Sequence, residues 1–142
     1  MKLQFKHQPF QEAAAQAVCD VFQGQPNQVG RYLVDHGFQK NSTQQSLLDS
    51  VGYNNAHLIP ELDNSILREN LHKVQDRGQI FQTDVLSDGI NLTVEMETGV
   101  GKTYTYIKTM YELNKQYGWT KFIIVVPSVA IREGVYKTFQ TT

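Results

Sequence analysis

Apolar residues recur at helical spacing in several parts of the chain. Phe10, Ala14, Ala17 and Val21 follow Pro9 at such spacing, which predicts a helix that stops at the polar turn of residues 24–27. Residues 60–77 predict a second helix, and residues 103–117 predict a third. Gly78 and Gly118 are placed to end these two helices. A further helix is expected from about Ser128.

Apolar runs predict strands elsewhere. Lys2–Phe5 reads as a short edge strand, and Ile90–Met96 and Lys121–Val126 read as longer ones. Residues 122–126 are apolar at every position, which is typical of a strand that helices cover on both faces. The order strand, helix, strand, helix over residues 90–142 predicts a right-handed crossover between parallel strands. We therefore expect an α/β fold with parallel strands flanked by helices.

Composition bounds the class of protein. The 142 residues are 40% hydrophobic and 19% charged, which are values for a globular chain, and the net charge of −1 gives no general basic field. Cys19 is the sole cysteine, so an internal disulfide is impossible and a small core residue is the favoured reading. Nothing resembles a signal peptide or a membrane span, so a cytoplasmic location is expected. Three parts are expected: 1–24 with a strand and a helix, 25–89 as an insertion with one helix, and 90–142 as the strand–helix unit.

The most informative motif is the glycine loop of residues 98–103, Thr-Gly-Val-Gly-Lys-Thr, between a predicted strand and a predicted helix. Gly99 and Gly101 permit close backbone approach, Lys102 can reach the β and γ phosphates of a nucleotide, and the Thr103 hydroxyl can ligate Mg²⁺. The strict phosphate-loop pattern asks for a glycine where Met96 stands. The alternative reading is a glycine turn with a surface lysine.

Other positions allow two readings each. Gln11 is either a solvated helix-start residue or, with Phe10 beside it, a reader of the adenine edge through its amide. Pro127 and Ser128 either end a strand and cap a helix, or contact a DNA phosphate at a helix N-terminus. Glu95 and Glu97 share a face of a predicted strand, and their roles stay open. The four histidines lack metal-ligand spacing.

Several separated stretches resemble one family, the restriction (Res) subunit of type III restriction-modification enzymes. They are residues 94–104, 112–118 and 121–136, together with residues 8–14, which look like the adenine-reading Q motif of that family. Val100 stands where the family more often has threonine. The resemblance implies a partial RecA-like P-loop NTPase lobe of the superfamily 2 helicase type. It implies ATP contacts from Phe10, Gln11, Thr98, Gly99, Val100, Gly101, Lys102, Thr103 and Tyr104, with Lys102 and Thr103 catalytic, and DNA backbone contacts from Pro127, Ser128 and Val129.

The resemblance also implies an activity. Such subunits are ATP-driven translocases and site-specific deoxyribonucleases that act on double-stranded DNA together with a modification methyltransferase. Their cofactors are ATP and Mg²⁺, and no membrane partner is expected. No Asp-Glu pair follows Lys102, so we expect these residues to be the N-terminal part of the motor, with little ATP affinity and no activity alone. The alternatives are the motor of a type I restriction enzyme or repair helicase, or a catalytically dead nucleotide-binding remnant.

Overall fold

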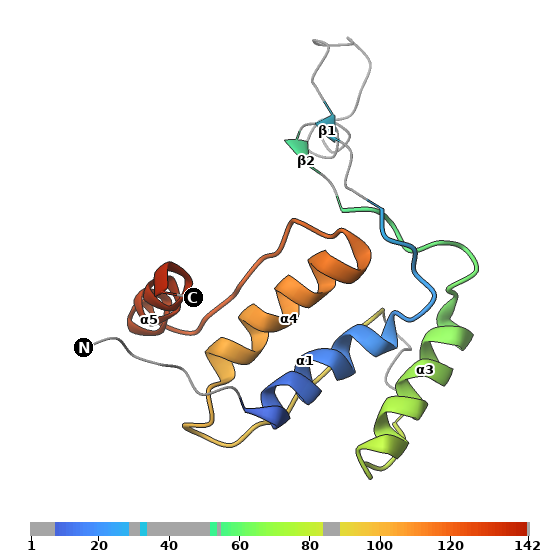
Figure 1. Cartoon of the computed structure of the whole chain (residues 1–142), viewed down its shortest axis with the longest axis horizontal. Coiled ribbons are helices and arrows are strands. Elements are labelled where there is room, and N and C mark those ends of the chain that lie inside the picture. Colours follow the sequence, from blue (N-terminus) through green and yellow to red (C-terminus); the bar gives the residue numbers. More distant parts are fainter. Residues whose placement is uncertain (1–7, 29–31, 34–51, 54, 84–88, 142) are drawn as a thin grey trace.

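The computed structural model describes residues 8–28, 32–33, 52–53, 55–83 and 89–141, and within them the architecture is helical (Figure 1). The helices are α1 (Pro9–Val21), α3 (Asn64–Arg77), α4 (Lys102–Tyr117) and α5 (Val129–Thr141). Two short strands, β1 (Tyr32–Leu33) and β2 (Gly52–Tyr53), pair antiparallel. None of the helices in these ranges has the length and apolar character needed to cross a bilayer.

The expected α/β fold with parallel strands is wrong for the described residues. Ile90–Met96 and Lys121–Val126 run without regular secondary structure, and the paired strands that the structure does describe are antiparallel. An apolar run becomes a strand only where a neighbour completes its ladder of hydrogen bonds, and no such ladder joins these two segments. Side chains of the second run face solvent, with Ile123 85% exposed and Val125 88% exposed. The predicted strand Lys2–Phe5 lies outside the described residues.

The helix predictions are confirmed, with one boundary displaced. α1 begins at Pro9. α4 ends at Tyr117 and is followed by Gly118, which has a left-handed backbone (φ +76°) and whose N–H donates to the Asn114 carbonyl. α3 begins at Asn64 rather than Pro60, because the Asp63 carboxylate accepts hydrogen bonds from the amides of Ser65 and Ile66 at 2.9 and 3.0 Å. Hydrogen bonds from the Ser65 hydroxyl and then the Ile66 amide lower the pKa of Asp63.

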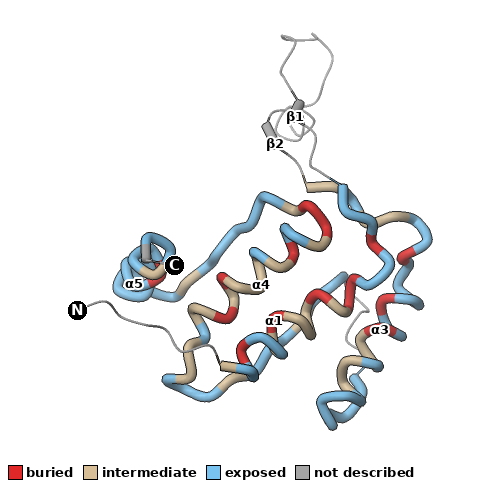
Figure 2. Tube along the Cα trace, viewed as in Figure 1, coloured by how far each residue is buried: buried red, intermediate tan, exposed pale blue. Residues whose placement is uncertain are grey.

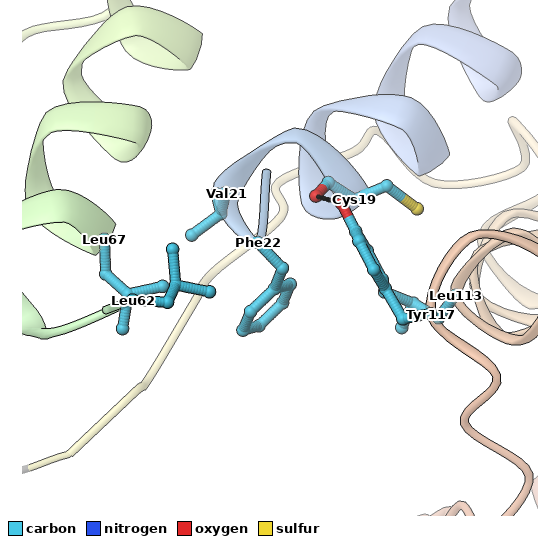
Figure 3. Close-up of a cluster of buried hydrophobic side chains, with 7 residues drawn as sticks. All are labelled: Cys19, Val21, Phe22, Leu62, Leu67, Leu113 and Tyr117. Carbon is cyan, nitrogen blue, oxygen red and sulfur yellow. Dashed lines mark hydrogen bonds between the residues drawn. The ribbon is translucent and has the colours of Figure 1, made fainter. Parts of the chain in front are cut away.

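The core lies where α1 packs against α4 on one side and α3 on the other. Buried positions concentrate along α1 and on the parts of α3 and α4 that lie beside it (Figure 2). In the close-up, Phe22 lies between the leucines at the start of α3 and the side chains of α4 (Figure 3). The cluster consists of Cys19, Val21, Phe22, Leu62, Leu67, Leu113 and Tyr117.

A buried hydrogen bond crosses this core from α4 to α1. The Tyr117 hydroxyl donates to the Cys19 carbonyl at 2.8 Å. Burial, followed by the nearby Glu112 and Asp20 carboxylates, raises the pKa of the Cys19 thiol to about 12. Because the thiolate is the reactive form, Cys19 is an inert core residue at neutral pH, as its helical setting predicts.

The C-terminal end of α4 is tied to segments on both sides of β1 and β2. The Asn27 side chain donates to the Lys115 carbonyl at 2.8 Å. The Asn55 carbonyl oxygen accepts from the amides of Thr120 and Lys121, both at 2.9 Å, and its amide nitrogen donates to the Lys121 carbonyl. Asn55 thus supplies at the start of the 121–126 run the kind of hydrogen bonds that a strand neighbour would give.

The division of the chain into three parts, with residues 25–89 as an insertion, stays a prediction.

Replacing one core leucine tests where the stability of this fold resides. Leu67 is 1% exposed, so Leu67→Ala should lower the free energy of unfolding by about 2–5 kcal/mol through lost burial and a residual cavity. Ile123→Ala, at a position 85% exposed, should change it by no more than about 0.5 kcal/mol. Urea unfolding followed by circular dichroism measures both. A larger loss at Ile123 would show that the 121–126 run, and not α1 with its neighbours, forms the core.

Candidate functional site

The glycine loop leads directly into α4, and Gly101 is the residue that precedes its first turn. Gly101 adopts the left-handed conformation with φ +91° and ψ +38°. Its carbonyl accepts the first hydrogen bond of the helix, from the Thr105 amide at 3.0 Å. The amides at the start of a helix have no partner inside the helix, so they are available to a ligand or to solvent.

The start of α4 differs electrostatically from the starts of α1, α3 and α5. α3 is capped by the Asp63 carboxylate, the Ser128 hydroxyl accepts from the Ile131 amide at the start of α5, and α1 carries Glu12 in its first turn. In this part of the chain, α4 has neither a side-chain cap nor an acidic residue in its first turn, and its first residue is the cation Lys102. The partial positive charge of the helix end and the ammonium group therefore reinforce each other, which favours an anion there.

The two glycines of the loop face different surroundings. Gly99 has φ +83°, and a Cβ placed on it would meet no atom within 4 Å. A Cβ on Gly101 would lie 2.5 Å from the Nε2 atom of Gln11. One side of the loop is consequently open, whereas α1 fills the other side.

Gln11 is the α1 residue that fills that side. Only 8% of its surface is exposed, and its Nε2 donates to the Val100 carbonyl at 2.8 Å across 89 positions of sequence. This burial rules out the reading of Gln11 as a solvated surface residue. Its neighbour Phe10 is 47% exposed. Farther along α4 from the loop, the Glu12 carboxylate and the Lys108 ammonium group form a second tie between α1 and α4 at 3.6 Å.

A cavity of about 600 Å³ lies beside α4, between the helix and the two extended segments. Among the described residues that line it, Lys102, which directly follows the glycine loop, is the one that carries a charge. The remaining lining is mostly apolar and includes Val94, Met96 and residues 122–125. A mostly apolar wall offers few hydrogen-bond donors to a polyphosphate, whereas the loop and the first turn of α4 offer backbone amides and the Lys102 ammonium group.

Comparison with known proteins identifies the family. The model of the family described as "Type III restriction enzyme, res subunit" matches residues 4–142. The chain belongs to this family. The chain is 57% identical over 47 residues to the StyLTI Res subunit of Salmonella typhimurium, a stretch that covers 33% of the chain and 5% of that relative.

Two further relatives are Res subunits of type III restriction-modification enzymes. The EcoPI Res subunit of Escherichia phage P1 is 47% identical over 70 residues, which cover 46% of the chain and 7% of that protein. The EcoP15I Res subunit of Escherichia coli is 60% identical over 43 residues, which cover 30% and 4%. The aligned stretches therefore span only 4–7% of the length of the curated relatives.

The structure brings some of the predicted site residues of this Res-family chain together and leaves others apart. The loop residues 98–101 and the first-turn residues Lys102, Thr103 and Tyr104 are continuous, and Gln11 reaches them from α1. Thr98, Gly99 and Lys102 are exposed, whereas the other loop and first-turn residues are half-buried. These ATP contacts, including Thr103 as a Mg²⁺ ligand, stay predictions.

The predicted DNA-contact residues lie at the start of α5. Pro127, Ser128 and Val129 are all exposed. The Ser128 hydroxyl accepts from the Ile131 amide at 3.3 Å, which is the helix-capping reading of this serine, and a contact with DNA stays a prediction. Glu95 and Glu97 are exposed, and their roles stay open. Across the described ranges, no group of three or more His, Cys, Asp or Glu side chains is arranged to hold a metal ion.

Alanine substitutions at Gly99 and Gly101 test whether the two loop glycines have different surroundings. Gly99→Ala should cost about 1–2 kcal/mol of stability, because a non-glycine residue is strained at positive φ. Gly101→Ala should cost more by about 0.5–1.5 kcal/mol, since Gln11 must also move and lose its bond to Val100. Urea unfolding provides the comparison.

Gly134→Ala is the control for these glycines. Gly134 lies within α5, where a Cβ meets nothing within 4 Å, so alanine should be neutral or stabilising there. Equal losses at Gly99 and Gly101 would show that Gln11 imposes no additional requirement for glycine.

Proposed function

We propose that this chain holds the triphosphate of ATP at the start of α4 and is the nucleotide-binding part of an ATP-driven DNA translocase of a type III restriction enzyme. The observation that carries the proposal is the helix start without a cap or a carboxylate, where Lys102 follows a loop with one open side. Membership of the Res-subunit family supports the same function.

Each loop residue has a role in this proposal. The amides of Val100, Gly101 and Lys102 donate to phosphate oxygens, and the Lys102 ammonium group neutralises charge on the β and γ phosphates. The half-buried hydroxyl of Thr103 suits a hard cation such as Mg²⁺, which in a nucleotide site offsets phosphate charge. Phe10, exposed at the start of α1, is available for contact with the base, and Gln11 reaches the loop from the same helix.

The proposed substrate is double-stranded DNA, and the proposed partner is a modification methyltransferase. The proposed location of the protein is the cytoplasm. The relatives are named as subunits of restriction-modification enzymes, which supports both proposals. Exposed residues 127–129 leave the backbone around the start of α5 accessible to a DNA phosphate.

Nucleotide binding without turnover is the role proposed for these residues by themselves. Hydrolysis by such motors needs a carboxylate that completes Mg²⁺ binding near the loop. Glu112 and Glu133 are the carboxylates that follow Lys102 in the sequence. Their side chains are engaged elsewhere, with Gln116 at 3.5 Å and Arg132 at 3.1 Å respectively.

Titration of the chain with inorganic tripolyphosphate and with ATP and Mg²⁺ tests the binding proposal. Two-dimensional amide NMR detects even millimolar affinity, and the largest shifts are expected at residues 99–104. Lys102→Ala should weaken binding about tenfold, the value of one lost charge-assisted contact of about 1.4 kcal/mol. Lys115→Ala, at the other end of α4, is the matched control and should leave affinity within about twofold. Shifts elsewhere, or equal losses in both variants, would contradict the proposal.

The same lysine tests the role of the motor in a complete enzyme. In a type III restriction complex that contains this sequence, Lys102→Ala should abolish ATP-dependent DNA cleavage, because the transferred charge is no longer stabilised. DNA binding, measured by gel shift at fixed salt, should be retained. Cleavage at the unaltered rate would show that Lys102 has no part in ATP use.

A further inference from the structure

We propose that Gln11 is a positioning residue that sets the conformation of the phosphate-binding loop before any nucleotide arrives, independently of the base. This inference rests on the proposed function, since it concerns how the loop meets phosphate. It assigns Gln11 a role distinct from reading adenine.

The first support is the hydrogen bond itself. The Gln11 Nε2 donates to the Val100 carbonyl at 2.8 Å, and the side chain is 8% exposed, so solvent competes little for the bond. A hydrogen bond of this length between a helix and a loop residue fixes the direction of one carbonyl group.

The direction of that carbonyl determines the direction of an N–H group. The peptide bond between Val100 and Gly101 is planar and trans, so its C=O and N–H point in opposite directions. Because Gln11 holds the Val100 oxygen toward α1, the Gly101 N–H points away from α1. That N–H is one of the donors that the loop can offer to an anion.

The second support is the glycine that Gln11 contacts. Gly101 carries φ +91°, and a Cβ there would lie 2.5 Å from the Gln11 nitrogen. Glycine at this position therefore meets two requirements, a left-handed backbone and space for the glutamine. Gly99, with similar φ and no neighbour within 4 Å, meets only the first.

The third support is that the helix carrying Gln11 is itself fixed against α4. Lys108 pairs with Glu12 at 3.6 Å, and the Tyr117 hydroxyl donates to the Cys19 carbonyl at 2.8 Å. Gln11 thus extends from a helix that cannot slide along α4 without breaking these contacts. The loop is held from a rigid element, as a precise binding site requires.

A base-free ligand separates positioning from base reading. The ligands are inorganic tripolyphosphate and ATP with Mg²⁺, titrated into the full chain and monitored by amide NMR. Gln11→Met keeps the length and packing of the side chain but removes the donor, so affinity for both ligands should fall by the same factor, about fivefold to tenfold. Gln11→Asn keeps the amide but shortens its reach, and it should show the same loss.

Gln16→Met is the matched control, because it makes the same substitution on the same helix and removes bonds that do not involve the loop. Its affinities should stay within about twofold of the unaltered chain. Loss of ATP affinity in Gln11→Met with tripolyphosphate affinity retained would overturn the proposal in favour of base reading alone. Unchanged affinity for both ligands would overturn it as well.

A measurement without ligand distinguishes failure of this inference from failure of the proposed function. In the free chain, the Gly101 amide resonance should move in Gln11→Met and Gln11→Asn and stay in place in Gln16→Met. If the unaltered chain bound neither ligand, the proposed function would fail, and these resonances would still decide whether Gln11 positions the loop. An unmoved Gly101 resonance would refute the positioning role.

Discussion

The packing of α1 along α4 is the constraint on which the rest of this structure depends. Residues from the middle and end of α1 bury themselves against the last turns of α4, where the Tyr117 hydroxyl bonds the Cys19 carbonyl. That seam fixes the axial position of α1, and so places Gln11 beside the glycine loop at the other end of α4. One residue of slippage moves a helix by about 1.5 Å along its axis, enough to break a hydrogen bond of ordinary length. The hydrophobic core at one end of the α1–α4 pair thereby sets the position of the hydrogen bond between Gln11 and Val100 at the other end.

The start of α4 leaves the amides of its first turn without a side-chain cap. At the starts of α3 and α5, by contrast, backbone amides of the first turn donate to a side-chain oxygen, that of Asp63 in α3 and that of Ser128 in α5. At Gly101 the backbone turns left-handed and the next side chain is a cation, so like charges gather without a counterion from the first turn. Positive charge gathered without an opposite charge costs stability, and an anion bound at this point would offset that cost under the function proposed above.

Local patterns predicted the helices and the position of the loop, because caps, glycines and apolar spacing act over a few residues. Asp63 shows the limit of even this local signal: its carboxylate sets the start of α3, although Pro60 is also a credible first residue. The strands predicted at 90–96 and 121–126 are absent, because a strand depends on hydrogen bonds from distant segments that local patterns do not show. The Gln11 bond to Val100 joins residues 89 apart, and no periodicity or motif spacing indicates it.

The exposed run of residues 121–126 has a consequence for how copies of the chain behave together. Ile123 and Val125 present β-branched side chains to water on a stretch of extended backbone, which is a template for edge-to-edge association. Lys121 and Pro127 bracket the run, one as a charge and the other as a residue without a backbone donor, and such flanking residues act as gatekeepers. Residues 122–126, between these two flanking residues, therefore form an apolar segment through which copies of the chain can associate at high concentration.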